Sequence, residues 1–84
     1  HDYEDTNPKY EILGSDTMYV GKSYTYTLSP NTWCSFSVDN EEVIIESVSM
    51  SDITIKCDKA NELIVLKAMI GKKVIEEKKI LVVD

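Results

Sequence analysis

Three stretches of the chain alternate between apolar and small or polar residues with a period of two. They are residues 24–28 (YTYTL), 34–38 (CSFSV) and 53–57 (ITIKC). Successive side chains of a β-strand point to opposite faces of the sheet, so each stretch offers one apolar face to a core and one polar face to water. This pattern predicts antiparallel strands that are buried on one side, packed as a sandwich.

Further strands are predicted from apolar runs that turn residues interrupt. Residues 63–70 form the longest such run, and Gly71 with two lysines predicts a hairpin into a strand over residues 74–83. Residues 63–79 also contain good helix formers, which leaves a helix as the competing interpretation. Gly71 and the density of valine and isoleucine on both sides of it favour two strands.

The predicted architecture is an all-β sandwich of about seven antiparallel strands. Residues 9–13 and 17–20 are interpreted as one broken edge strand, and Trp33 is predicted to cap an edge of the core. The other strands are expected at residues 22–28, 33–38, 43–48, 53–57, 63–70 and 74–83. The residues predicted to form the core are Tyr24, Tyr26, Phe36, Val38, Ile53, Ile55, Leu66, Ala68, Ile80 and Val82.

Length and charge narrow the possible roles. Eighty-four residues are enough for one small domain, expected over residues 9–84, and residues 1–8 are interpreted as a linker or a segment derived from a tag. A net charge of −6 repels phosphate backbones and anionic lipids, so nucleic acid is not an expected partner. The longest apolar runs are too short to span a bilayer, so no membrane insertion is expected.

No pattern of residues predicts catalysis, a cofactor or a metal. The single histidine, His1, lies at the terminus, and Cys34 with Cys57 supplies too few ligands for a zinc site. Residues 39–42 (DNEE) could offer several oxygens to calcium, but a solvated turn is the favoured interpretation. Cys34 and Cys57 are expected to point inward from two strands, and the sequence leaves open whether they are free thiols or a disulfide. No catalytic, cofactor-binding or metal-binding residues are therefore predicted.

Two segments carry a resemblance to a known family. Residues 12–26 (ILGSDTMYVGKSYTY) and 33–40 (WCSFSVDN) resemble the bacterial immunoglobulin-like domains (Big_2-like), particularly those appended to structural proteins of tailed phages. Residues 53–56 and 66–68 fit the same scheme, so the resemblance covers roughly residues 9–83. The chain departs from the family pattern in two places. The tryptophan precedes the strand instead of occupying its central core position, and the segment between Leu28 and Trp33 is short for the family.

The resemblance implies an immunoglobulin-like β-sandwich and a non-enzymatic role. Such a domain would decorate or connect a phage structural protein in the virion, through assembly contacts with neighbouring subunits or weak adhesion to a protein or a cell-surface polymer. A second placement is a module of a bacterial adhesin or cell-wall protein, at the cell surface or secreted. A third is a noncatalytic carbohydrate-binding domain, for which Trp33 and Tyr19 would be the exposed aromatic residues. Fold alone does not distinguish these roles.

Overall fold

The computed structural model describes residues 9–84, and its regular structure there consists of eight β-strands. The prediction for residues 1–8 lies outside the described residues. The helix considered over residues 63–79 is not formed, because this segment contains one whole strand, residues 63–70, and the first part of the next, residues 73–83. The strands are β1 (Glu11–Leu13), β2 (Thr17–Tyr19), β3 (Ser23–Ser29), β4 (Ser35–Val38), β5 (Val43–Val48), β6 (Asp52–Cys57), β7 (Leu63–Ile70) and β8 (Lys73–Val83).

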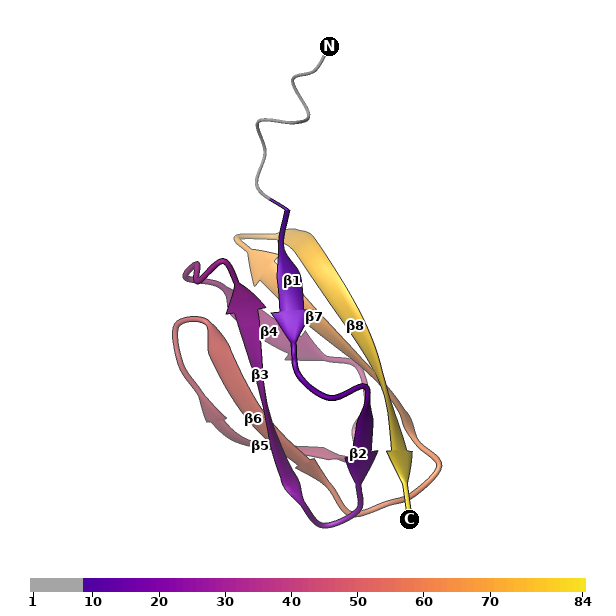
Figure 1. Cartoon of the computed structure of the whole chain (residues 1–84). Helices are drawn as coiled ribbons and strands as arrows, with labels where there is room; N and C mark the ends of the chain where they lie inside the picture. Colours follow the sequence, from indigo (N-terminus) through magenta and orange to yellow (C-terminus); the bar gives the residue numbers. More distant parts are fainter. Residues whose placement is uncertain (1–8) are drawn as a thin grey trace.

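The strands form two four-stranded sheets, with the orders β1-β3-β6-β5 and β2-β8-β7-β4 (Figure 1). This confirms the prediction of an all-β chain whose strands form two layers. The expected count of about seven differs because the broken edge strand is two strands in different sheets. The expected purely antiparallel pairing is also wrong at one place, since β2 pairs with β8 in parallel, with Met18 opposite Val82.

The crossing from one sheet to the other occurs between β1 and β2, at Gly14, Ser15 and Asp16. The ring of Tyr26 packs so closely on Gly14 that a Cβ there would lie 2.3 Å from its Cδ2 atom. The hydroxyl of Tyr26 donates a 2.6 Å hydrogen bond to the carbonyl of Ser15, and Lys78 forms a 2.5 Å ion pair with Asp16. These contacts hold the first strand of one sheet against the last strand of the other.

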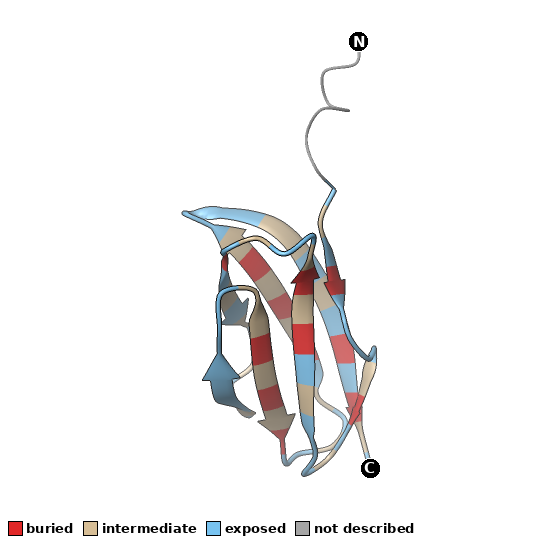
Figure 2. Ribbon diagram, turned by 60° about the vertical axis from the view of Figure 1, so that its left-hand side comes forward, coloured by how far each residue is buried: buried red, intermediate tan, exposed pale blue. Residues whose placement is uncertain are grey.

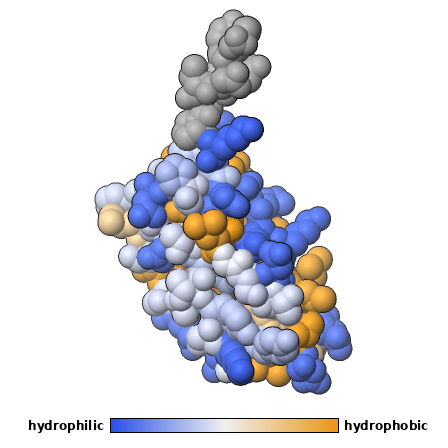
Figure 3. Space-filling model, viewed as in Figure 1, coloured by the Kyte–Doolittle hydropathy of each residue, from blue (hydrophilic) through white to orange (hydrophobic). Residues whose placement is uncertain are grey.

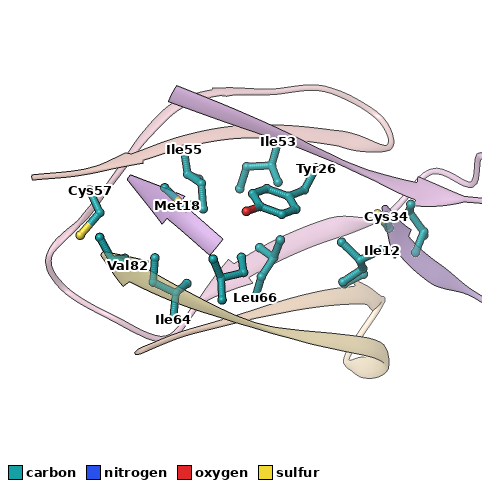
Figure 4. Packing of buried hydrophobic residues seen from close by; sticks show 13 residues of the cluster. Ile12, Met18, Tyr26, Cys34, Ile53, Ile55, Cys57, Ile64, Leu66 and Val82 are labelled. Carbon is teal, nitrogen blue, oxygen red and sulfur yellow. The ribbon is translucent and has the colours of Figure 1, made fainter. Parts of the chain in front are cut away.

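The core lies between the two sheets and follows the predicted alternation (Figures 2 and 4). Seven of the ten predicted core residues are at most 1% exposed, whereas Tyr24, Phe36 and Val38 pack against the core and are only half-buried. Strand β3 buries Tyr26 and Leu28 on one face, while Thr25 on the other forms a 2.8 Å hydrogen bond to Thr54 of β6. The buried residues that were not among the ten predicted are Ile12, Met18, Leu28, Cys34, Cys57 and Ile64.

Candidate functional site

The edge strand β5 exposes apolar side chains that point toward the core face of its sheet. Val43, Ile45 and Val48 pair directly with β6 residues that are at most 1% exposed. Directly opposed residues of neighbouring strands project on the same face, so these three side chains lie on the core face. Ile45 is nevertheless 50% exposed and Val48 56% exposed. Strand β5 is accordingly coloured as exposed along nearly its whole length in Figure 2, while β6 beside it alternates.

The opposite sheet leaves β5 uncovered because its own edge strand on that side, β4, has only four residues. Phe36 and Val38 of β4 pair with buried residues of β7 and therefore also point inward, yet both stay half-buried. The turn over residues 39–42 joins β4 directly to β5, which puts the two edges on the same side of the sandwich (Figure 1). We call this region, formed by Phe36, Val38, Val43, Ile45 and Val48, the open side.

A β-bulge at Glu46 keeps the apolar residues of β5 on one face. Ile45 pairs with Ile55, the register then shifts, and Ser47 pairs with the next β6 residue, Thr54. Without the extra residue, Val48 would point to the outer face, because side chains alternate with a period of two. The carboxylate of Glu46 instead accepts a hydrogen bond from the hydroxyl of Ser23 on the outer face. The bulge therefore adds Val48 to the open side.

The segment of the chain that contains the open side is acidic. Residues 35–57 contain five carboxylates (Asp39, Glu41, Glu42, Glu46 and Asp52) and one lysine, Lys56. This stretch therefore has a net charge of −4, out of −6 for the whole chain. The face formed by β1, β2 and β3 shows apolar areas separated by hydrophilic ones (Figure 3). The apolar core face of β5 thus belongs to an acidic segment, most of whose carboxylates lie in the turn before β5, with Glu46 on the outer face of the sheet.

The turn at residues 39–42 is held by the side chain of Asn40. Its amide nitrogen donates to the carboxylate of Glu62 at 3.0 Å and to the carbonyl of Leu63 at 2.9 Å. Its amide oxygen accepts a 2.8 Å hydrogen bond from the backbone N–H of Glu42. Of the oxygens considered as calcium ligands in residues 39–42, the side-chain oxygen of Asn40 thus closes the turn. Among residues 9–84, no group of three or more histidine, cysteine, aspartate or glutamate side chains is placed to hold a metal ion.

Trp33 does not cap the core, and this prediction is wrong. Cys34 occupies the inward position and donates its backbone N–H to the carbonyl of Met50, so Trp33 before it projects outward and is 76% exposed. The indole borders a shallow groove of about 270 Å³, on the side where β4 meets the β7–β8 hairpin. The groove is lined by Trp33, Cys34, Ser35, Met69, Ile70 and Gly71.

The structure does not bring the two candidate carbohydrate-binding aromatic residues together. Tyr19 is 51% exposed and pairs with Val83, at the end of β8. Trp33 lies beside Gly71, just before β8 begins. The length of β8, eleven residues, therefore separates the two rings, so they cannot form one platform.

Both cysteines are buried free thiols, and Figure 4 shows them at opposite ends of the core. Burial, together with the nearby carboxylate of Asp52, raises the pKa of the Cys34 thiol. Burial also raises the pKa of Tyr26, with smaller contributions from Tyr24 and Asp16. Both shifts favour the neutral form, which is the less reactive form of a thiol or phenol. His1 lies outside the described residues.

Sequence reasoning missed the open side because residues 43–48 (VIIESV) show a mixed pattern rather than a clean alternation. The signal that was present is the lack of a polar residue between Val43 and Ile45. Comparisons of the chain with family models, with curated proteins and with solved structures find no match. Within residues 9–84, no helix could cross a membrane.

Proposed function

We propose that residues 9–84 form an immunoglobulin-like domain. Immunoglobulin constant-type domains order their strands A-B-E-D in one sheet and C-F-G in the other. With β1 and β2 taken as two halves of the first strand, the order β1-β3-β6-β5 corresponds to A-B-E-D, and β4-β7-β8 corresponds to C-F-G. The disulfide of antibody domains has no counterpart, since Cys34 precedes β4 and Cys57 ends β6. This strand order supports the immunoglobulin-like assignment.

The domain's proposed role is non-enzymatic, as an accessory domain of a phage structural protein that acts through contacts with neighbouring virion subunits or a host surface. The observation that carries the contact role is the open side, where core-facing residues such as Ile45 stay about half exposed. Isolated surface residues need no explanation, but several apolar side chains along one uncovered edge are typical of contact surfaces. The resemblance of residues 12–26 and 33–40 supports the placement on a virion.

The proposed placement on a virion is tested by the position of the gene that encodes the chain and by labelling of purified particles. If the chain belongs to a phage structural protein, its reading frame lies among genes for virion proteins, and antibodies against the chain label purified particles. A reading frame with an export signal and tandem copies of the domain, together with unlabelled particles, would transfer the proposal to a bacterial surface adhesin.

Trp33 favours a second candidate function, the binding of a cell-surface polymer. An exposed indole beside a groove is a surface on which a sugar ring stacks, and Trp33 is the one tryptophan in the sequence. Its fluorescence therefore reports on this position alone. Titration with cell-wall glycans should change the emission if the groove binds them, and an unchanged spectrum at saturating glycan would remove this candidate.

A further inference from the structure

The free edge of β5 has the properties that allow another strand to pair with it. Among residues 9–84, the four edge strands are β1, β2, β4 and β5, and β5 is the longest, with six residues against three or four in the others. An edge strand leaves a row of backbone N–H and C=O groups without strand partners. A six-residue edge can therefore offer several main-chain hydrogen bonds to an added strand.

Strand β8 has an inward-pointing lysine, a form of edge protection that β5 lacks. Its pairing with β2 covers only Leu81–Val83, so most of its second edge is also free. That stretch contains Lys78, whose side chain points inward, opposite the buried Leu66, and is 17% exposed. Lysines and inward-pointing charges on an edge prevent strand addition. Strand β5 contains no lysine and no inward-pointing charge. Its one charged residue, Glu46, lies at the β-bulge, which interrupts the ladder there, and accepts a hydrogen bond from the hydroxyl of Ser23 on the outer face.

The open side also provides sites for the side chains of an added strand. A strand paired with β5 would place every second side chain on the core face, next to Val43, Ile45 and Val48 and facing the half-buried Phe36 and Val38 of β4. Apolar side chains at those positions would extend the core over residues that are now exposed to water. Strand addition of this kind takes its affinity from main-chain hydrogen bonds and its specificity from alternate side chains.

Charge selects the partner. The net charge of −4 on residues 35–57 attracts a cationic segment, and the remaining side chains of the added strand face water, where lysine or arginine is tolerated. A second copy of the same chain is disfavoured, because pairing β5 with β5 would bring two such acidic regions together. The complementary sequence therefore alternates apolar and basic residues.

We propose that the open side binds an extended segment of another protein, in which apolar residues alternate with lysine or arginine, as an additional strand on β5. The inference rests on the proposed contact role, but it names the surface and the chemistry of the partner independently of whether the parent is a phage or a cell-surface protein. A failure to bind such a segment would overturn this inference, whereas the gene context and particle labelling would be unaffected.

The test uses the full chain and three capped synthetic peptides: one alternating lysine with valine, one alternating glutamate with valine, and a lysine–valine peptide N-methylated at alternate residues. Binding is followed by backbone amide chemical shifts. The lysine–valine peptide should shift amides of residues 43–48 and 36–38. The other two peptides should bind at least about tenfold more weakly, because they lack the charge match or the main-chain donors.

A matched pair of variants locates the site. Ile45 and Leu81 are strand residues with nearly equal exposure, 50% and 48%, in different sheets. Ile45→Lys should weaken binding of the lysine–valine peptide by at least about tenfold, whereas Leu81→Lys should change it by less than about twofold. The inference would be overturned by equal effects of the two variants, by unweakened binding of the N-methylated peptide, by the absence of binding, or by dimerisation of the chain through β5.

Discussion

Replacing Gly14 by alanine tests the crossing between the two sheets. A Cβ at this position would lie 2.3 Å from Cδ2 and 2.6 Å from Cε2 of Tyr26. The ring is fully buried, and its hydroxyl is bonded to Ser15, so it cannot swing away without breaking that bond. Gly14 also has a φ of +150°, a conformation that residues with a side chain rarely adopt. The substitution should therefore destabilise the fold strongly.

Two costs add at Gly14. A residue held in a sparsely populated backbone region costs about 1–3 kcal/mol. Forcing an extra methyl group into a packed core costs about 1–3 kcal/mol more. The total of about 2–6 kcal/mol is a large share of the stability expected for 84 residues, about 4–13 kcal/mol. With a urea dependence of about 1 kcal/mol per molar for a chain of this size, the unfolding midpoint should fall by about 2 M or more.

Urea unfolding followed by far-ultraviolet circular dichroism measures this loss, because Trp33 is too exposed to report on packing. Gly71→Ala is the matched control, since Gly71 has a φ of +64° but no atom within 4 Å of the added Cβ. It should cost only about 1–2 kcal/mol, from the backbone alone. In a Tyr26→Leu background, the cost of Gly14→Ala should drop toward the same value. Equal costs for the two glycine substitutions in the original chain would contradict the packing argument.

Three further perturbations test the buried groups and the turn. Tyr26→Phe removes a 2.6 Å hydrogen bond and should cost about 1–2 kcal/mol in urea unfolding. Burial raises the pKa of Tyr26 above its unfolded value of about 10, so stability should fall as the pH rises above that value. The fall should be less steep in Tyr26→Phe than in Tyr19→Phe, the control at an exposed site. Equal slopes in the two variants would contradict this. The Cys34 thiol is buried and has a raised pKa, so at neutral pH it should react with iodoacetamide at least about tenfold more slowly in the folded than in the urea-unfolded chain. Mass spectrometry of the labelled peptide measures both rates. Equal rates would show that the thiol is not buried. Asn40→Ala removes three hydrogen bonds and should cost about 1–3 kcal/mol in urea unfolding. Asn31→Ala, whose side-chain hydrogen bond with Ser51 is 3.5 Å long, should cost less than about 0.5 kcal/mol. Equal costs for the two substitutions would mean that Asn40 does not hold the turn.

The alternation of side chains predicted which face of each regular strand is buried. Tyr26, Ile55 and Leu66 are fully buried, as expected, because a period of two fixes the face whichever strand lies beside it. The hairpin at Gly71 was predicted for an equally local reason, since a residue with positive φ suits a tight turn. These predictions depend only on neighbours in the sequence.

The parts that sequence did not predict depend on how far each sheet extends. Met18 was assigned to the same edge strand as residues 9–13, but it pairs with Val82 of the other sheet, a contact 64 positions along the chain. Trp33 is exposed because Cys34 takes the inward position just before a strand that begins at Ser35. Ile45 is on the core face but uncovered, because the opposing strand is short. The period of two along a strand indicates which side chains share the core face of the sheet. It contains no information on whether the other sheet extends far enough to cover them.

The uncovered state of β5 can be measured directly from methyl relaxation in the presence of a soluble nitroxide. Ile45 and Ile55 are ideal for comparison, because they have the same side chain, sit opposite each other and point to the same face. Ile45 is 50% exposed and Ile55 is 0% exposed. The nitroxide should therefore broaden the methyl signals of Ile45 strongly and leave those of Ile55 almost unchanged. Equal protection of both residues would mean that the edge is covered and that no open side exists.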